Sequence, residues 1–537
     1  MGSKALITVF LVFLPTILAQ NLRSAVLSID TTAKIAETDD NYICATIDWW
    51  PKEKCNYNQC PWGSSSLLNL DLSHPLLFNA VQAFKSLRLR LGGSLQDQVH
   101  YDIGSSQPCK PFKKQKGGLF GFSEGCLPME RWDELNGFFQ KTGVLVTFGL
   151  NALRGRHQTR RGVWLGNWDS SNARDFVRYT ISKGYHICSW EFGNELCGKG
   201  IGASVGAEQY AKDVTKLNSI ISEESKGLHS KPLVLAPGGF YDKDWYSRLL
   251  QLSGPEKVDV LTHHIYNLGA GVDHNLISKI LNPYYLNKVT STFGNLSSTI
   301  QNDGSWSSAW VGEAGGAYNN GGRNVSDTFV NSFWYLDQLG LAAKYNTKVY
   351  CRQTLIGGNY ALLDTSTFIP NPDYYSALLW HQIMGKGVLS IHSSEPYLRS
   401  YAHCSKGGGG VAVLLINLSN ETAFNIEIES ATHFDSLVEE KTESERNAFV
   451  RNLKKTVAWI GSKTGDENLW REEYHLTPKD GDLQSKIMLL NGEPLQLTNA
   501  GGIPSLGPVF VDLNSPMYIE PLSIKFIVLP NFNAPGC

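Results

Sequence analysis

The spacing of apolar residues changes once along the chain, near Gly385. Before this point, short apolar runs alternate with longer stretches in which apolar residues recur every three or four positions. This alternation is typical of successive βαβ units that share one parallel sheet. From Lys386 onward the helical spacing fades, and short apolar runs are separated by Gly, Asn and Pro. The second pattern indicates an antiparallel β-sandwich.

Eight apolar runs in the first region have the length and composition of buried strands. They are Ile43–Ile47, Leu87–Leu91, Val144–Phe148, Ile187–Phe192, Leu233–Ala236, Val258–His263, Ala309–Gly312 and Lys348–Arg352. The helices expected between them include Glu130–Lys141, Asn172–Lys183, Ala207–Glu224 and Asp327–Tyr345. Eight βα units over this length predict an α/β fold, a (β/α)8 TIM barrel at residues 43–385. The alternative is an open doubly wound sheet, but the Gly-rich turn that usually follows its first strand is absent after Asp48.

Residues 386–537 are expected to form a C-terminal antiparallel β-sandwich domain. Its predicted strands include Val411–Leu418, Phe424–Ile428, Val457–Ile460, Ile487–Leu490 and Ile524–Val528. The four glycines at 407–410 lie between two strand-like runs and predict a hairpin loop.

The N-terminus predicts export. Lys4 precedes an apolar run from Ala5 to Leu18, and Ala19 offers a small residue for cleavage. Because the run is too short to span a bilayer well, we interpret residues 1–19 as a removed signal peptide and not as a membrane anchor. The ten cysteines fit an oxidising compartment, as do the glycosylation sequons at Asn295, Asn324, Asn417 and Asn420. We expect a secreted protein of the extracellular space or cell wall, or one of a vacuole or lysosome-like compartment.

The overall charge argues against two classes of partner. A net charge of -2 and a pI of about 6.7 do not suit a protein whose main partner is nucleic acid or an anionic membrane. One short basic run, Lys110–Lys116, is interpreted as a solvated loop, with a contact for a polyanionic glycan as the alternative. Cys55 and Cys60 have no second Cys/His pair at zinc spacing nearby.

The candidate chemistry lies at two strand ends. In a (β/α)8 barrel, catalytic side chains come from the carboxyl ends of the strands. The fourth predicted strand leads into Trp190–Glu195, and the seventh leads into Glu313 within Trp310–Gly316. Glu195 and Glu313 are three strands apart around the circle, so they can face each other across the barrel mouth.

Two facing carboxylates are what cleavage of a glycosidic bond requires. One is protonated and gives its proton to the leaving oxygen, while the other is ionised and attacks or stabilises the anomeric carbon. A separation of ~5–5.5 Å predicts retention through a covalent intermediate. Asn194 offers an amide to a sugar 2-hydroxyl, and the glycines after Glu313 allow close approach of the substrate. The alternative is that Glu195 and Glu313 are structural partners of Arg90 or Arg352.

Neighbouring polar and aromatic residues have structural interpretations. Glu191 is expected to be a buried partner of Arg90. His263 and His264 point to opposite faces of a strand, so they cannot easily share a metal ion. Since two carboxylates and water suffice for the reaction, no metal or other cofactor is expected. Three tryptophans near the first strand either stack on sugar or pack in the core: Trp49, Trp50 and Trp62.

Several motifs together resemble the heparanase family, glycoside hydrolase family 79, over nearly the whole mature chain. They are Leu89–Gly93, Trp190–Glu195, Gly312–Gly322, Ser326–Phe329, Trp334–Gly340, Arg352–Gln353, Gly357–Tyr360 and Pro372–Tyr375. Within the family, the plant heparanase-like proteins and β-glucuronidases are the most similar. The resemblance implies that Glu195 is the general acid/base and Glu313 the nucleophile.

The resemblance also implies a site for a sugar carboxylate, since the family cleaves β-linked glucuronic acid. Gln353 and Tyr360 match residues that reach this carboxylate, helped by backbone N–H groups of the loop that contains Asn319 and Asn320. Neutral donors can recognise an anion in a partly buried pocket. Three further residues match substrate-site positions: Asp48 and Ser94 at sugar hydroxyls, and Tyr266, which orients the nucleophile.

Further implications of the resemblance concern the rest of the chain. Cys404 and Cys537 match a disulfide pair, and residues 20–42 are implied to join the C-terminal sandwich. The segment after Tyr101 is much shorter than the insert that the animal enzymes excise, so we expect a single uncut chain. Basic sites that grip heparan sulfate are not matched, so this polymer is not the expected substrate.

We therefore expect a secreted retaining β-glucuronidase that releases terminal β-linked glucuronic acid from arabinogalactan-type glycans or from phenolic glucuronides. Its expected partner is a glucuronic-acid-containing carbohydrate and not nucleic acid. Peripheral association with the cell wall or a membrane surface stays open, and a monomer is expected. Two alternatives remain, a retaining β-glycosidase for a neutral sugar and a non-catalytic cell-wall glycan-binding protein.

Overall fold

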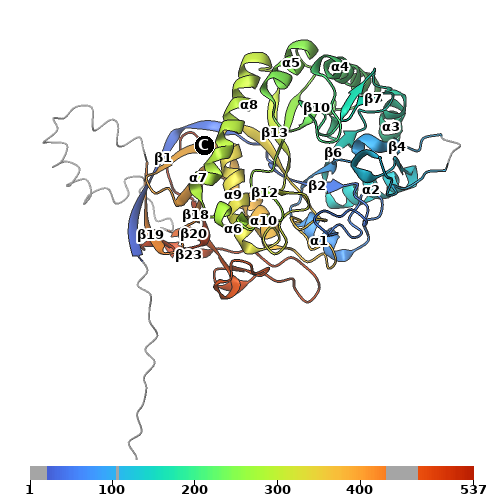
Figure 1. The fold of residues 1–537 in the computed structure, drawn as a ribbon. Helices are drawn as coiled ribbons and strands as arrows, with labels where there is room; N and C mark the ends of the chain where they lie inside the picture. The colour runs from blue at the N-terminus through green and yellow to red at the C-terminus, as the bar shows by residue number, and fades with distance from the viewer. Residues whose placement is uncertain (1–20, 105–107, 431–469) are drawn as a thin grey trace, which may run out of the picture.

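The chain forms a closed barrel that lies against a second, strand-rich sheet (Figure 1). The computed structural model describes residues 21–104, 108–430 and 470–537. The predicted signal segment and the predicted strand Val457–Ile460 lie outside these residues. Among the helices of the described ranges, none is long and apolar enough to cross a membrane.

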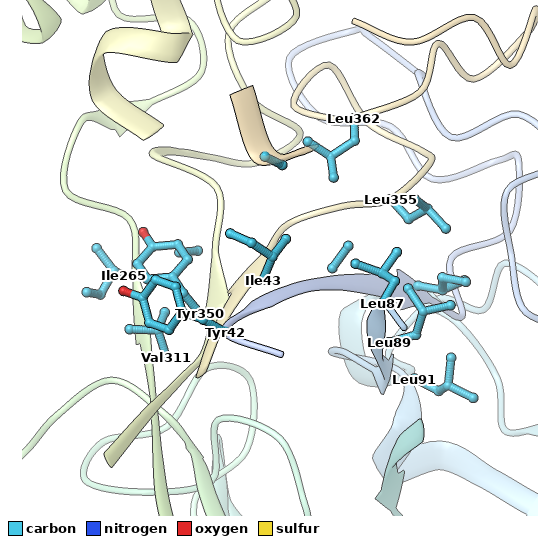
Figure 2. Close-up of a cluster of buried hydrophobic side chains, with 14 of the residues drawn as sticks. Tyr42, Ile43, Leu87, Leu89, Leu91, Ile265, Val311, Tyr350, Leu355 and Leu362 are labelled. Atoms are coloured by element: carbon cyan, nitrogen blue, oxygen red, sulfur yellow. The ribbon is translucent and has the colours of Figure 1, made fainter. Parts of the chain in front are cut away.

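Eight parallel strands close the barrel in the order β10-β11-β13-β15-β2-β3-β6-β9. Their bounds are β2 (Ile43–Asp48), β3 (Arg88–Gly92), β6 (Leu145–Leu150), β9 (Ser189–Phe192), β10 (Leu233–Gly239), β11 (Val260–Ile265), β13 (Ser308–Ala314) and β15 (Thr347–Arg352). Each strand overlaps one of the eight predicted runs, so the (β/α)8 barrel is confirmed. Strands enclosed by helices are apolar along most of their length, which made them visible in the sequence. Figure 2 shows part of this core, with buried side chains from β2, β3, β13 and β15.

Ten α-helices lie in the described chain, and capping residues mark the ends of several of them. Their bounds are α1 (Pro75–Gln82), α2 (Met129–Thr142), α3 (Ser171–Ser182), α4 (Ala207–Glu224), α5 (Lys243–Ser253), α6 (Leu276–Ile280), α7 (Pro283–Leu286), α8 (Thr290–Asp303), α9 (Phe329–Lys344) and α10 (Pro372–Ile383). Helix α2 ends at Gly143, whose φ of 70° is the left-handed conformation of a helix C-cap. Helix α5 follows Asp242, whose side chain accepts a hydrogen bond from the N–H of Trp245. Helix α9 is buried almost throughout, because it contacts both the barrel and the second sheet.

The second sheet has the strand order β22-β21-β20-β25-β18-β17-β16-β1-β19-β24, with β23 paired to β20. Its strands are β1 (Asn21–Glu37), β16 (Met384–Ser393), β17 (Leu398–Ser405), β18 (Val411–Asn417), β19 (Thr422–Ser430), β20 (Trp470–Pro478), β21 (Met488–Leu490), β22 (Glu493–Pro494), β23 (Val509–Asp512), β24 (Met517–Ile519) and β25 (Ser523–Leu529). The N-terminal strand β1 lies between β16, to which it is antiparallel, and β19, to which it is parallel. The other described pairs of this sheet are antiparallel.

Strand β18 is buried on both faces, which explains its unbroken apolar sequence. Leu414 and Ile416 belong to the core that includes the barrel, whereas Val413 and Leu415 face a separate core within the second sheet. Successive side chains of a strand point to opposite faces, so one apolar run serves both cores. The second sheet therefore holds its own strands together while it also packs against the barrel.

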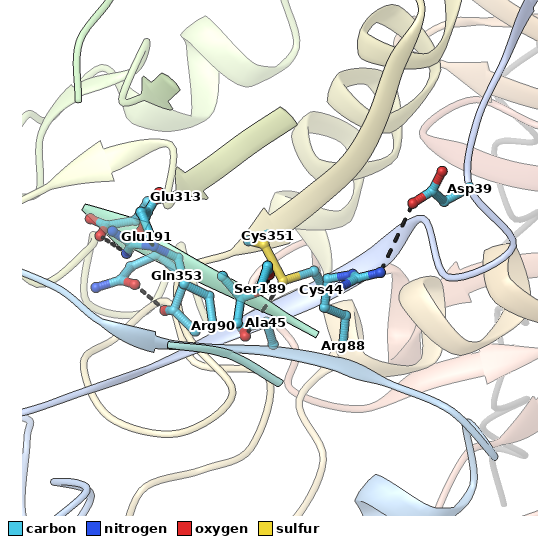
Figure 3. The surroundings of a disulfide bond; sticks show 12 residues. Asp39, Cys44, Ala45, Arg88, Arg90, Ser189, Glu191, Glu313, Cys351 and Gln353 are labelled. Carbon is cyan, nitrogen blue, oxygen red and sulfur yellow. Dashed lines mark hydrogen bonds and ion pairs between the residues drawn. A yellow bond between two sulfur atoms is a disulfide. The ribbon is translucent and has the colours of Figure 1, made fainter. Parts of the chain in front are cut away.

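Four disulfides link the described chain. Cys44–Cys351 joins β2 to β15, the first and last barrel strands in sequence, at directly paired positions (Figure 3). Cys404–Cys537 ties β17 to the C-terminus, as the family resemblance implied. The other two bridges are Cys55–Cys60 and Cys109–Cys126, and the free thiols are Cys188 and Cys197.

The four sequons differ in accessibility. Three of their asparagines are exposed: Asn295, Asn324 and Asn420. Asn417 is fully buried, and its amide donates to the carbonyl oxygens of Thr422 and Glu520 at 2.8 and 2.9 Å. Because this amide is enclosed and already bonded in the folded chain, it cannot carry a glycan there, and the expectation at Asn417 is corrected.

Candidate active site

The two predicted glutamates lie at the carboxyl ends of the fourth and seventh barrel strands. Glu313 lies within β13, and Glu195 follows β9 in a tight turn. Glu195 has a φ of 55°, a left-handed conformation that is uncommon for a residue other than glycine. Its N–H donates to the carbonyl of Gly238 at 2.7 Å, and its carbonyl accepts from the N–H of Ile201 at 3.0 Å. These two hydrogen bonds hold the turn that aims Glu195 at the barrel mouth.

The two carboxylates are close together and buried. One side-chain oxygen of each glutamate and one ring nitrogen of His264 lie within 4.8 Å of one another. This closeness fits the ~5–5.5 Å between carboxyl groups of retaining glycosidases better than the ~6.5–9.5 Å of inverting ones. Three such atoms can also surround a metal ion, but Arg90 already donates to Glu313 and places a positive charge there. The arrangement thus suits cleavage by two carboxylates.

Arg90 of β3 connects three residues of the site, and Figure 3 shows it beside two of them, Glu191 and Glu313. Its guanidinium donates to Glu191 at 2.6 Å, to Glu313 at 2.9 Å and to Asn194 at 2.8 Å. The predicted pair of Glu191 with Arg90 is confirmed. Glu313 is also a partner of Arg90, as the structural alternative supposed, but this contact is compatible with a role in chemistry because a guanidinium also orients the carboxylate that it contacts.

Glu313 receives a second donor from Tyr266. The Tyr266 hydroxyl donates to Glu313 Oε1 at 2.6 Å, while Arg90 occupies Oε2. Burial and the negative charge of Glu313 raise the pKa of Tyr266 well above its ordinary value, so the hydroxyl keeps its proton. With a donor on each oxygen, the carboxylate of Glu313 is fixed in orientation.

Glu195 is paired with a histidine instead of a cation. Its Oε1 lies 2.9 Å from Nδ1 of His264. Burial raises the pKa of Glu195 to about 7, against the opposing effect of Arg90. Burial also lowers the pKa of His264 to about 4. Between these two values Glu195 carries a proton and the imidazole is neutral. As predicted, the neighbouring His263 points elsewhere, with Nδ1 on the carbonyl of Trp310.

Asn194 holds a buried donor without a partner. Its Oδ1 accepts from Arg90, and its backbone N–H donates to Asp97 at 2.8 Å. Within the described residues its Nδ2 has no hydrogen-bond partner. An unpaired buried donor is costly, so a ligand oxygen at this point would be favoured. This is the geometry that a sugar 2-hydroxyl would satisfy.

Asp48 and Gln353 form a buried pair beside the glutamates. Gln353 Nε2 donates to Asp48 Oδ2 at 2.7 Å, and Gln353 Oε1 accepts from the hydroxyl of Thr46. Burial and then the charge of Glu313 raise the pKa of Asp48 well above its ordinary value. The adjacent Gly93 has a φ of 96°, and a Cβ there would lie 2.0 Å from Asp48 Oδ1, so only glycine fits. Gln353 thus positions Asp48.

The expected carboxylate loop is held by side chains from the first βα loop. Asn319, Asn320 and Gly321 all have positive φ, a conformation that asparagine and glycine adopt more readily than other residues. Asn320 Oδ1 accepts from Trp62 Nε1 at 2.9 Å, and Asn319 Nδ2 donates to the hydroxyl of Tyr57 at 3.0 Å. Gly322 N–H donates to a serine hydroxyl at 2.9 Å within the loop itself. The two asparagine side chains therefore shape the loop.

The remaining predicted residues of the site are Tyr360, Ser94 and the three tryptophans. Tyr360 is buried against Gly315 and Gly321, where an added Cβ would come within 3.0 Å or less of its ring. Ser94 is half-buried directly after β3. The tryptophans near the first strand are all buried, which favours core packing over sugar stacking: Trp49, Trp50 and Trp62.

Three contacts of positioning groups were not predicted from the sequence. They are the hydrogen bond from Arg90 to Asn194, the one from Asn194 to Asp97 and the one from Trp62 to Asn320. Asp97 accepts the N–H groups of Asn194 and Ala152, and burial raises its pKa to about 7. The only sequence signal was Arg90 itself, a charge inside an otherwise apolar strand, which is rare unless the charge is paired.

An eight-stranded parallel barrel with paired buried glutamates after its fourth strand and in its seventh defines a glycoside hydrolase of the barrel class. Residues 24–340 match the model of the glycosyl hydrolase family 79 N-terminal domain. The chain belongs to glycosyl hydrolase family 79, and its substrate is accordingly a carbohydrate.

Individual relatives agree with this assignment. The chain is 58% identical to heparanase-like protein 2 of Arabidopsis thaliana over 525 residues, covering 97% of each chain. It is 41% identical to baicalin-beta-D-glucuronidase of Scutellaria baicalensis over 514 residues, covering 92% of this chain and 90% of that one. Among solved structures, the GH51 arabinofuranosidase of Xanthomonas axonopodis pv. citri has a TM-score of 0.63 at 13% identity and covers 94% of this chain and 99% of its own. The last likeness concerns the fold alone.

Proposed function

We propose that this chain is a retaining β-glucuronidase that releases terminal β-linked glucuronic acid from arabinogalactan-type glycans or from phenolic glucuronides. The observation that carries the mechanism is the asymmetry of the two glutamates. Glu313 has a donor on each oxygen, and Glu195 has a neutral imidazole and a raised pKa. Similarity to a baicalin-beta-D-glucuronidase over most of both chains supports the choice of sugar.

In the first step, Glu195 acts as the general acid and Glu313 as the nucleophile. The ionised Glu313 attacks the anomeric carbon, while Glu195 gives its proton to the departing glycosidic oxygen. The bond from carbon to the leaving oxygen breaks as the ester to Glu313 forms. Asn194 Nδ2 donates to the sugar 2-hydroxyl, and this hydrogen bond strengthens in the transition state.

In the second step, Glu195 changes from general acid to general base. Once Glu313 is esterified its charge is lost, and the charge of Arg90 then acts more strongly on Glu195. The pKa of Glu195 falls as a result, so this carboxylate can take a proton from water. The resulting hydroxide attacks the anomeric carbon and frees Glu313.

The sugar carboxylate is proposed to bind on the opposite side of the pocket from the leaving group. Gln353, Tyr360 and backbone N–H groups of the loop at Asn319 and Asn320 supply neutral donors there. Asp48 bonds to sugar hydroxyls, because its buried carboxyl accepts from Gln353 and is close enough to Glu313 to feel its charge. Ser94, half-buried at the rim, is a further hydroxyl contact.

The test is hydrolysis of a chromogenic aryl β-D-glucuronide at about pH 5, where Glu195 is protonated. Wild type should release the chromophore, and Glu313→Gln should not, while its melting temperature stays near that of wild type. Glu195→Gln should be strongly impaired as well. Equal rates on a matched β-D-glucoside would instead favour a neutral-sugar glycosidase. No release on either sugar by a folded protein would favour the glycan-binding alternative.

We also propose secretion to the extracellular space, the cell wall or a vacuole-like compartment, as a glycosylated monomer. Four disulfides and exposed sequon asparagines at 295, 324 and 420 support an oxidising route. Expression with a C-terminal fluorescent tag tests the destination, and a cytosolic signal would contradict it. Enzymatic removal of N-linked glycans should lower the mass of the protein, and the glycan sites should be these three asparagines and not Asn417.

A further inference from the structure

Phe240 is a large apolar side chain exposed at the barrel mouth. It directly follows β10, at the carboxyl end where the site lies, and 40% of its surface is exposed. Its ring centroid lies 6.3 Å from that of His264 and 6.2 Å from that of Tyr266. The ring is therefore packed on one side against two residues of the site and open on the other.

One side chain lies between Phe240 and each carboxylate. His264 is bonded to Glu195, and Tyr266 is bonded to Glu313. In the proposed mechanism the proton of Glu195 goes to the leaving oxygen, so the leaving group must lie next to Glu195. A second exposed apolar side chain, Ile201, also lies there, since its N–H donates to the carbonyl of Glu195 and 45% of its surface is exposed.

Isolated exposed apolar residues are common on protein surfaces, so exposure alone indicates nothing. The position of Phe240 is different, because its ring rests on the two residues that contact the reacting carboxylates. A ring held at a strand end offers a rigid face to a ligand, and aromatic rings gain from offset or edge contacts with each other. Neither Phe240 nor Ile201 has a side-chain group to bond the hydroxyls of a sugar.

We propose that Phe240, together with Ile201, forms the leaving-group subsite, and that this subsite selects flat phenolic aglycones over sugars. The inference rests on the proposed function and narrows it to one of its two substrate classes. The aglycone ring lies against Phe240, with its glycosidic oxygen toward Glu195, while the glucuronate occupies the pocket between Asp48 and Tyr360.

The test compares two glucuronides that differ only in the aglycone, naphthyl and methyl. Phe240→Ala should lower kcat/KM for naphthyl β-D-glucuronide about tenfold and change that for methyl β-D-glucuronide less than about twofold. Each ratio is taken against wild type on the same substrate, so the different reactivities of the leaving groups cancel. Phe240→Tyr, which keeps the ring, should stay near wild type on both. Phe510→Ala is the matched control, since Phe510 is 61% exposed but belongs to β23 of the second sheet (Figure 1).

An equal loss on both glucuronides would overturn the inference, because Phe240 would then act only by positioning His264 and Tyr266. No loss on either would overturn it too. If wild type hydrolyses neither glucuronide, the proposed function fails, and the subsite is tested by calorimetric binding of free naphthol. Naphthol binding that is weakened by Phe240→Ala but not by Phe510→Ala supports the subsite, and binding that is absent or equal in all three proteins contradicts it.

Discussion

Glu195 and Glu313 have the same side chain in opposite surroundings. Arg90 and Tyr266 both donate to Glu313, whereas Glu195 meets a neutral imidazole. Two donors fix the orientation of Glu313, whereas burial raises the pKa of Glu195 to about 7. The division into nucleophile and acid in the proposed mechanism thus comes from tertiary partners on other strands.

Replacement of Tyr266 by phenylalanine removes one of the two donors on Glu313 and leaves the ring in place. A hydrogen bond to a charged group contributes about 1.5–3 kcal/mol, so Tyr266→Phe should lower kcat about tenfold to a hundredfold. The melting temperature should change little. Steady-state kinetics on an aryl glucuronide check this, and an unchanged kcat would mean that the orientation of Glu313 does not depend on Tyr266.

The pKa of Glu195 sets an alkaline limit on activity. Burial raises it to about 7, and the first step needs the protonated form. Activity should therefore be present below this pH and decline as the pH rises through about 7. A profile of kcat/KM against pH tests the assignment. The decline should persist in Tyr266→Phe, whose change touches the other carboxylate, and should vanish from the residual activity of Glu195→Gln.

The sequence was sufficient for the residues whose position depends on one strand. Glu195 and Glu313 were predicted because each stands at a strand end, and Glu191 because it needs a buried partner. The hydrogen bonds of Asn194 with Arg90 and with Asp97 were not predicted, since they join residues far apart in sequence. The pairing of Cys44 with Cys351 was open for the same reason.

At the scale of elements, the loop between β2 and α1 acts as a support for the proposed carboxylate site. The Cys55–Cys60 disulfide closes this loop, and Asn56, Tyr57 and Gln59 beside it bond to the loop at Asn319 and Asn320. Trp62 adds a buried hydrogen bond to the same asparagine loop. One loop that contributes no proposed catalytic group therefore shapes another that is proposed to contact the substrate.

A substitution at Trp62 should weaken substrate binding. Trp62→Phe removes the donor to Asn320 Oδ1 but keeps an aromatic ring, so KM for a glucuronide should rise several-fold with a smaller change in kcat. Tyr57→Phe, which removes only the exposed contact with Asn319, is the control and should be nearly silent. A fall in kcat alone would place the effect of Trp62 on the glutamates instead.

The sequence pattern missed partly exposed strands of the second sheet, such as β16 and β20. Strand β16 carries glycines, lysine and histidine and is partly exposed, and β20 contains three consecutive charged residues, at 471–473. Neither has the continuous apolar run by which the barrel strands were recognised. The second sheet was predicted as a class, while its strand order was not, because order depends on pairing across long stretches of chain.

At the scale of the whole molecule, the Cys44–Cys351 bridge fastens the barrel where it closes. Its two cysteines are separated by 307 residues, so the chain-entropy estimate of its contribution reaches about 6 kcal/mol. The double change Cys44→Ala with Cys351→Ala should lower the melting temperature clearly. The pair Cys55→Ala with Cys60→Ala, which opens a separation of only 5 residues, should lower it less. Equal losses would mean that loop length does not govern these bridges.

The place of β1 fixes an order of events during synthesis. This strand begins the described chain, yet its neighbours β16 and β19 follow the last barrel strand. On the ribosome β1 is made first and its partners are made only after every barrel strand. The barrel strands can therefore meet before β1 has either of its neighbours. A chain that ends early would lose the partners of its own first strand, so damage at the end of the molecule would unpair its beginning.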